Sequence, residues 1–439
     1  MHPLTSLVCA GLLIAPPLSV RAEVTPRSHQ GPFGLEVQTE MESYYGHDSN
    51  LLWQRDNGQS IGSDFIGVAP EFRMVGERGL DRYQFNYLGD YRRYGSSHSD
   101  DYADHQFQFD GNWSFSLRNA FKLMYQYRLG HEARGEGLTE GFMQQGREKP
   151  SGDATFGRFN IAEPLRFKRS EVGGRYSYGA PDARGKLELA LSHKDLGYLD
   201  KHFYQHNFER YMAEQEWQEN TAIVELFEQV SNVSRFRYTL QANLRRYPAN
   251  PRNDSDEFFL SAGVVSQLTG KTRIDANIGG IYKYFTNDPQ AESFRGLSWD
   301  LRLDWQPLDY SNLALISSRT IRDQSGDGGY VSSQLYGAEW QHHWLPRVAT
   351  TLSYHDIRDD YHQSVVCGND THHRQDDIHR WGMGISYDIR PSINLGFHYQ
   401  QADSGSSFGG QPIDIGGNCY GRALGYDKQQ LSLSLKVAI

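Results

Sequence analysis

Apolar and polar residues alternate along the chain from Leu35 to Gly46 and again from Leu431 to Ile439. The same alternation recurs in about sixteen further segments between these two, and a period of two is typical of a β-strand whose faces meet different environments. In a soluble sandwich the polar face would meet water and the apolar face a core. So many regularly joined strands instead favour a closed barrel in a lipid bilayer. We therefore predict an all-β fold, a single transmembrane antiparallel up-and-down β-barrel of about 18 strands (roughly 16–18).

Short and long connections alternate between the predicted strands. Tight turns such as Ser116–Asn119 and Arg390–Ser392 alternate with long polar loops such as His131–Pro164 and Lys194–Asn220. Bacterial outer-membrane barrels have short periplasmic turns and long extracellular loops, and an even number of strands places both termini in the periplasm. A wide barrel left open would leak small solutes. We therefore expect one of these two loops, the second of which is rich in helix formers over Phe208–Trp217, to fold over the pore.

The two ends of the chain carry targeting signals. The apolar stretch Leu7–Leu18 precedes Val20-Arg21-Ala22, which predicts a secretory signal peptide cleaved before Glu23. The last segment, Tyr426–Ile439, resembles the terminal signal that the barrel-assembly machinery reads, although it ends in Ile where Phe is usual. The predicted domains are a signal peptide (1–22), a short periplasmic N-terminal segment (23–34) and the outer-membrane β-barrel (35–439).

The composition agrees with a membrane barrel and excludes other classes. No run of eighteen apolar residues follows the leader, which excludes membrane-spanning helices. Aromatic residues make up 13% of the chain, with 27 Tyr, and such rings suit membrane interfaces. The formal net charge of −10 argues against nucleic acid as a partner. We expect the barrel to lie in the bacterial outer membrane, in contact with its lipid and lipopolysaccharide.

Two cysteines remain after the leader, which carries Cys9, is removed. Cys367 and Cys419 both fall in predicted long loops of an exported chain, where a disulfide is the natural expectation. The bond would close a loop of about fifty residues and stabilise by about 4 kcal/mol in the chain-entropy description. Two free loop thiols are the alternative.

The inward positions of the alternation carry charges of both signs, which a dry core could not satisfy but a water-filled lumen can. These charges either attract a charged polymer or pair with each other across strands, and the alternation does not decide between the two. The lumen-lining candidates are Arg73, Arg92, Lys122, Arg128, Arg175, Arg237, Arg245, Arg302, Glu40, Asp90 and Asp300.

Candidate catalytic and metal-binding groups do not form a recognisable pattern. The 17 His show no ligand spacing, which argues against a metal site. His355-Asp356 and the loop Ser97–Asp101 contain the residue types used by outer-membrane hydrolases, but those enzymes are smaller barrels. We predict no catalytic residue, no metal and no cofactor, and therefore not an enzyme.

Four short motifs resemble a known family. Tyr44–Leu51, Asp90–Tyr94, His131–Gly135 and Tyr178–Gly185 are similar to landmarks of the beta-barrel porin 2 family. Members are outer-membrane barrels often found with genes for exopolysaccharide and capsule synthesis. The resemblance implies a barrel of about this size that passes a secreted polysaccharide across the outer membrane, together with a periplasmic polysaccharide-export protein.

The sequence therefore predicts a passive exit pore for an exopolysaccharide or capsular polysaccharide. Two alternatives stay open. One is a general or substrate-selective porin for small solutes, and the other is a surface anchor that holds polymer without conducting it.

Overall fold

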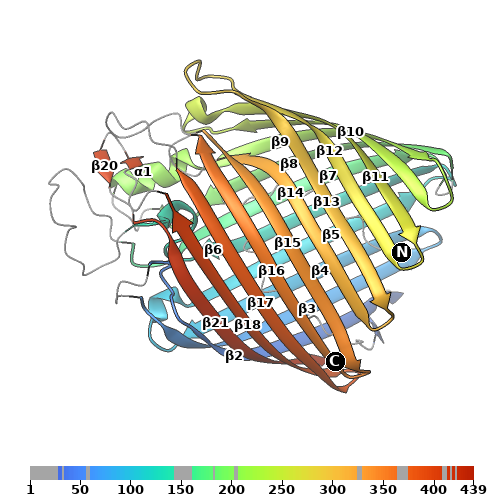
Figure 1. Ribbon diagram of the computed structural model, residues 1–439, viewed down its shortest axis with the longest axis horizontal. Helices are drawn as coiled ribbons and strands as arrows, with labels where there is room; N and C mark the ends of the chain where they lie inside the picture. Colours follow the sequence, from blue (N-terminus) through green and yellow to red (C-terminus); the bar gives the residue numbers. More distant parts are fainter. Residues whose placement is uncertain are drawn as a thin grey trace.

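The computed structural model describes residues 28–31, 34–55, 60–142, 161–180, 183–201, 206–323, 329–362, 374–407, 413–415, 418–420 and 423–439. Most of these residues belong to long antiparallel strands, and one α-helix is present among them (Figure 1). The elements are β1 (His29–Gln30), β2 (Glu36–Asp48), β3 (Ser63–Arg78), β4 (Asp81–Tyr94), β5 (Tyr102–Ser114), β6 (Asn119–Glu132), β7 (Leu165–Tyr178), β8 (Gly185–Tyr198), α1 (His206–Glu214), β9 (Trp217–Gln229), β10 (Ser234–Arg246), β11 (Ser255–Thr269), β12 (Thr272–Phe285), β13 (Phe294–Leu308), β14 (Ser311–Asp323), β15 (Tyr330–Leu345), β16 (Val348–His362), β17 (Gln375–Arg390), β18 (Ile393–Ser406), β19 (Ile413–Ile415), β20 (Asn418–Tyr420) and β21 (Tyr426–Ala438).

The main sheet closes on itself. It has nineteen strands in the described residues, and without the two-residue β1, which pairs with β2, the other eighteen form the ring. β2 pairs with β3 on one side and with β21 on the other, where Tyr45 lies opposite Leu433. Closure leaves no free sheet edge, which is the condition for a sheet in lipid. The predicted antiparallel barrel and its count of 18 strands are confirmed.

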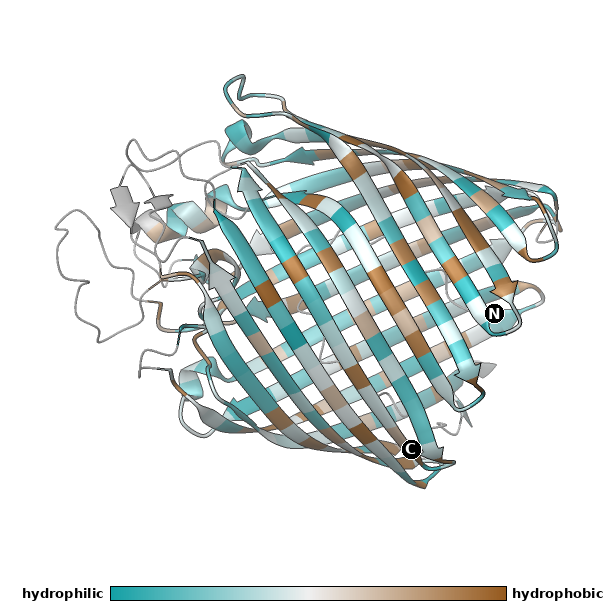
Figure 2. Cartoon of the chain, in the orientation of Figure 1, coloured by the Kyte–Doolittle hydropathy of each residue, from teal (hydrophilic) through white to brown (hydrophobic). Residues whose placement is uncertain are grey.

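The two faces of the wall differ as the alternation predicts. On β2, Met41 and Tyr45 are exposed on the outer face, whereas Tyr44 and Asp48 lie on the inner face and are half-buried and buried. Figure 2 shows hydrophobic and hydrophilic residues alternating along the strands all over the visible wall. Exposed large apolar side chains such as Ile278 continue this outer belt around the ring. The outer face therefore suits lipid, and the inner face suits water.

The ends of the barrel are unlike each other. The short turns lie at the end where both chain termini are marked, and α1 lies at the opposite end among the long connections (Figure 1). Exposed Trp305, Tyr310 and Trp344 stand near the turns, where amphipathic rings suit the membrane interface. We call the two ends the turn end and the loop end. No helix among the described residues is long and apolar enough to cross a membrane.

Two predictions fall largely outside the described residues. Residues 1–27 are among those not described, so the signal peptide and its cleavage site stay predictions. Cys367 is also outside the described residues, whereas Cys419 belongs to β20, which pairs with β19 inside the last long connection. The Cys367–Cys419 disulfide therefore stays a prediction.

A charge placed on the outer face tests the assignment of faces. Leu433 of β21 is 53% exposed on the outer face, and Ser432 beside it lies on the inner face opposite His398. We expect Leu433→Arg to lower the free energy of unfolding in liposomes by about 2–4 kcal/mol, the cost of a cation near the bilayer midplane. Urea unfolding measures the change. Ser432→Arg is the matched control and should cost less, so equal losses would contradict the assignment.

Candidate functional site

Part of the β6–β7 connection crosses the loop end of the barrel. This mouth segment (residues 133–142) passes the connection after β2 at Gly135, where a Cβ atom would stand 1.9 Å from the Leu52 carbonyl oxygen and φ is +90°. Only glycine fits there. Further along, the Gly141 carbonyl accepts a hydrogen bond of 2.7 Å from the Ala423 N–H, just before β21. The segment is thus tied to strands on both sides of the closing seam.

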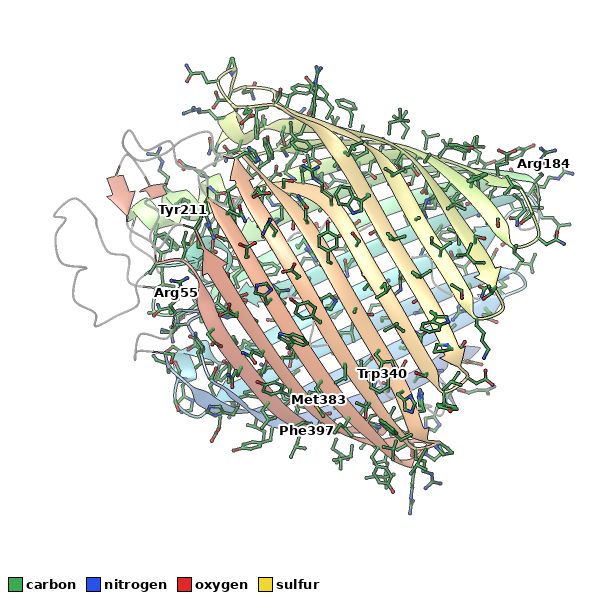
Figure 3. All side chains as sticks on the ribbon, in the orientation of Figure 1. Arg55, Arg184, Tyr211, Trp340, Met383 and Phe397 are labelled. Atoms are coloured by element: carbon green, nitrogen blue, oxygen red, sulfur yellow. The ribbon has the colours of Figure 1, made fainter. Side chains whose placement is uncertain are left out.

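Helix α1 packs on the mouth segment. Phe142 and Phe208 meet edge to face with ring centroids 6.0 Å apart. Figure 3 places Tyr211 at the loop end of the barrel, far from Arg184 at the turn end. Each large apolar side chain buried here contributes about 1.5–3 kcal/mol, so both loops are anchored in place. The buried cluster consists of Leu138, Phe142, Ile161, Leu165, Phe167, Tyr198, Phe208, Tyr211 and Met212.

Parts of both loops that were predicted to fold over the pore lie at the loop end, and their closing of the pore stays a prediction. The described residues 133–142 of the first loop and α1 of the second lie together at the loop end. The helix-forming stretch predicted over Phe208–Trp217 is helical up to Glu214, and Trp217 already begins β9.

The tip of β14 parts from β13 and stays paired with β15. The β13–β14 ladder ends at the pair that contains Trp299, although β13 begins at Phe294 and β14 continues to Asp323. Ile321, near the end of β14, is buried against Phe294. Phe294 lies on the inner face, three residues from the exposed Leu297. The tip of β14 therefore sits on the lumen side of β13.

Charged side chains of the inner wall hold this tip. The Asp323 carboxylate accepts hydrogen bonds from Arg245 of β10 and Lys283 of β12, neither of which neighbours β14 in the sheet. Lys283 Nζ also lies 2.6 Å from Glu257 Oε1, and Arg245 Nη2 lies 2.7 Å from Glu219 Oε2. The Lys283 side chain is 0% exposed. Four strands thus contribute charge to one buried cluster around the tip.

The opposite side of the tip continues the chain of contacts. Arg322 donates to Asp359 of β16. The ring of Tyr361, also on β16, lies 6.0 Å from the Arg322 guanidinium and 4.0 Å from that of Arg374. Arg374 Nη2 lies 2.6 Å from Glu140 Oε1 in the mouth segment. We call this set of charged residues the mouth network: Glu140, Glu219, Arg245, Glu257, Lys283, Arg322, Asp323, Asp359, Arg374 and Asp376.

The mouth network is buried, so it stabilises the structure only when each of its charges has a partner. The Arg374 side chain is 1% exposed and its Nε lies 2.9 Å from Asp376 Oδ2. Burial acts to lower the pKa of Arg374, but Glu140, Tyr361 and Asp376 raise it well above its ordinary value, so the guanidinium stays charged. Removing one partner of a buried ion pair typically costs about 3–5 kcal/mol because the other charge is left unpaired. The mouth network therefore fixes the β14 tip and the mouth segment relative to the wall.

The cationic lumen candidates point to the inner face and are paired with acids along the wall. The pairs are Arg73 with Glu71, Lys122 with Asp110, Arg128 with Asp104, Arg175 with Glu188 and Glu225, Arg237 with Asp275, Arg245 with Glu219, and Arg302 with Asp304. Glu40 pairs with Lys436 of β21, and Asp300 lies opposite Asn277 of β12. Opposite charges therefore lie side by side on the inner face, and their part in transport stays a prediction.

Arg92 and Asp90 form a different arrangement near the loop end. The Tyr44 hydroxyl donates to the Asp90 carboxylate, and Tyr102 Oη donates to the same group at 3.0 Å. The Arg92 guanidinium lies 4.4 Å from the ring of Phe65. These two residues therefore join three strands through aromatic rings.

Most residues of the mouth network were not predicted from the sequence. Of its members only Arg245 was predicted to line the lumen. Arg322 was predicted to start a loop at Arg322–Gly329, but β14 extends through Asp323. That loop boundary was wrong because β14 stays paired with β15 through Asp323 after its pairing with β13 has ended. The adjacent opposite charges Arg322-Asp323 at a strand end were the available signal.

The groups considered for catalysis make structural pairs. Ser97 Oγ donates to Asp100 Oδ2 at 2.7 Å, and Arg134 Nε donates to Asp100 Oδ1 at 2.7 Å. His355 lies 3.5 Å from Glu339 on the inner wall. Within the described ranges, no group of three or more His, Cys, Asp or Glu residues is placed to hold a metal ion.

One family matches part of the chain. Residues 227–414 match the family described as "Putative beta-barrel porin 2", which is less than half of the 439 residues. The match supports the resemblance seen in the sequence, and it covers β10–β18 with the β14 tip. The four short motifs that suggested the family all lie before it. No curated protein matches the chain.

Solved barrels of similar shape share little sequence with the chain. The crystal structure of Pseudomonas aeruginosa OccK2 (OpdF) in complex with glucuronate has a TM-score of 0.49 and 11% identity, and covers 92% of this chain and 98% of its own. P. aeruginosa OccK1 (OpdK) has a TM-score of 0.49 and 10% identity, with 92% and 99% covered. Acinetobacter baumannii OccAB3 has a TM-score of 0.47 and 9% identity, with 92% and 99% covered.

Breaking the mouth network should loosen the β14 tip. In Asp323→Asn, Arg245 and Lys283 lose a charged partner inside the wall, which costs about 3–5 kcal/mol. We expect a higher single-channel conductance, or more frequent opening, than in the unaltered protein in a planar bilayer. The matched control is Asp275→Asn, which removes the acid paired with Arg237 on the half-exposed lumen wall. If the Asp323→Asn channel conducts like the unaltered one, the mouth network does not restrict the pore.

The mouth segment should respond to pH through Glu136. Burial and the Glu132 carboxylate raise the pKa of Glu136 to about 8, against the opposing effect of Lys428 and Arg380. An acid whose pKa is raised stabilises the packed arrangement when protonated, so this contribution is full below about pH 4 and is lost as pH rises towards 8. Conductance should therefore rise between roughly pH 5 and pH 9, and recordings in planar bilayers over this range measure the change. Glu136→Gln, which stays neutral, should flatten that rise; an unaltered pH profile would exclude Glu136.

Proposed function

We propose that the chain is an outer-membrane porin that lets small polar solutes diffuse passively through a hydrated lumen and selects them at its loop end. The observation that carries this proposal is the mouth network, which holds the mouth segment and the β14 tip across part of the opening. The match of residues 227–414 to a family named for porins supports the same conclusion.

The wall chemistry supports a path for solutes with no strong preference for one charge. Cations and acids pair along the inner face, as Arg175 does with Glu188 at 2.5 Å and with Glu225 at 2.6 Å. A lining of one sign would concentrate the opposite charge, and paired charges cancel that field at a distance. Selection then depends on size and hydrogen bonding at the mouth.

Export of an exopolysaccharide or capsular polysaccharide is the second candidate, and it rests on the family resemblance. A polymer would need a periplasmic export protein as partner, and a wide chain would need the mouth network to open. That step breaks several buried ion pairs. Each broken pair costs about 3–5 kcal/mol, because it leaves a buried charge without its partner. A non-conducting surface anchor for polysaccharide is the third.

Two measurements on the full-length mature protein separate these functions. The first is conductance of the purified protein in a planar bilayer. The second is a gene deletion in which uptake of small solutes is measured, and polysaccharide is assayed separately on the cells and in the medium.

A porin gives a steady small conductance, and its loss slows uptake while polysaccharide stays unchanged. An exit pore is closed or flickers when alone, and its loss removes surface polymer. An anchor conducts nothing, and its loss sheds polymer into the medium. Absence of conductance together with altered polymer would overturn the proposal.

A further inference from the structure

The barrel wall has a second place where neighbouring strands part. The β5–β6 ladder ends at the pair His105–Leu129, although β5 begins at Tyr102 and β6 runs on to Glu132. Residues 102–104 still pair with β4, and residues 130–132 still pair with β7. The unpaired stretch is three residues on each strand, or about 10 Å of seam at the loop end.

Side chains, and not backbone hydrogen bonds, span this seam. His131 Nδ1 lies 2.8 Å from Asp104 Oδ1, and the rings of His131 and Tyr102 stand 4.0 Å apart. Arg128 Nη2 lies 3.7 Å from Asp104 Oδ2. Side chains can rotate away at far lower cost than a strand ladder can break.

A hollow of about 750 Å³ lies at the seam and is lined by residues of both faces of the wall. Ile66 and Leu129 belong to the outer face, whereas Arg92, Asp104 and Phe167 belong to the inner face. Its volume is within the range of about 300–1,000 Å³ that small-molecule sites occupy. The hollow therefore lies within the wall at the seam and is bordered by residues of both faces.

The seam between β13 and β14 shows that parting strands need not leave a hollow. There the buried side chains of Ile281, Phe294, Ile321 and Tyr330 pack into one cluster. At the β5–β6 seam the Tyr102 and His131 rings are in contact, but the hollow beside them stays unfilled. Its open state is a feature of this position and not a general consequence of strands that part.

The charges around the hollow point to an anionic ligand. Among the acids that line it, Asp104 is held by His131, and Asp101 accepts a hydrogen bond of 2.7 Å from the Tyr94 N–H. Glu163 has a partner too, and Arg166 pairs with Asp200 at 2.9 Å. Arg93 is exposed on the outer face and makes no ion pair within the described part of the chain. Arg93, which lies opposite the outward Ile66, is therefore a cation on the lipid-facing rim of the hollow that has no ionic partner among the described residues.

We propose that the β5–β6 seam is a side opening that binds a single-chain anionic amphiphile, such as a long-chain carboxylate. Its apolar chain lies on Ile66 and Leu129, and its charged head meets Arg93. A membrane glycolipid with several acyl chains exceeds this hollow, whereas a single chain fits it. The inference rests on the proposed function only in placing the barrel in the outer membrane, and it adds a lateral route to the axial one.

The test is photo-crosslinking of the full-length mature protein in lipid nanodiscs with a diazirine-bearing long-chain carboxylate. Mass spectrometry then maps the labelled residues. We expect saturable labelling concentrated at residues 102–104 and 129–131 and displaced by excess unlabelled carboxylate. Labelling spread evenly over the apolar belt, or not displaced, would overturn the proposal.

Two variants sharpen the test. Ala103→Trp fills the hollow and should abolish the concentrated labelling, whereas Ala276→Trp, at a fully paired outer position of β12, should leave it unchanged. Arg93→Ser should weaken carboxylate labelling roughly tenfold, as loss of a charge-assisted hydrogen bond would, and leave labelling by the corresponding neutral alcohol unchanged. If Ala103→Trp and Ala276→Trp behave alike, the side opening is excluded.

Conductance separates this inference from the proposed function. Ala103→Trp lies on the outer face and should leave ion conductance through the lumen unaltered. Specific labelling of a protein that does not conduct ions would contradict the proposed porin function and support the side opening. Conductance with only diffuse labelling would do the reverse.

Discussion

The structure depends on one constraint: a backbone N–H or C=O in lipid must find its partner within the protein. A sheet satisfies this only by closing, and the pairing of β2 with β21 is the contact that closes it. Once the ring is closed, the alternation of each strand assigns one residue to lipid and the next to water. The apolar belt and the polar lumen both follow from that pairing.

Two places where neighbouring strands part lie at the loop end, where strands emerge towards the membrane surface and unpaired groups are less costly. They are resolved in different ways. The β14 tip bends inward, and its charges Arg322 and Asp323 find partners on strands that β14 does not touch in the sheet. At the β5–β6 seam the strands stay in the wall, and His131 with Asp104 bridges the gap. The irregular positions therefore carry the buried charges and the hollow on which the proposals for passage rest.

Charge is arranged in two ways inside the barrel. Along the wall, cations and acids pair at partly exposed positions, where each pair is worth little to stability. At the mouth the pairs are buried, as Lys283 is, and an incomplete set is costly. The same residue types thus form partly exposed pairs along the wall and a buried cluster at the mouth.

The sequence by itself determined the strands, the short turns, the alternation of faces and the count of 18, because a period of two and regular turn chemistry are local properties. It also singled out the two loops that contain α1 and the mouth segment, which pack against each other at the loop end. It did not determine that Asp323 meets Arg245 and Lys283, or that β5 parts from β6. Those contacts join residues far apart in the chain, and they exist only because the ring fixes which strands face each other across the lumen and where two neighbours diverge.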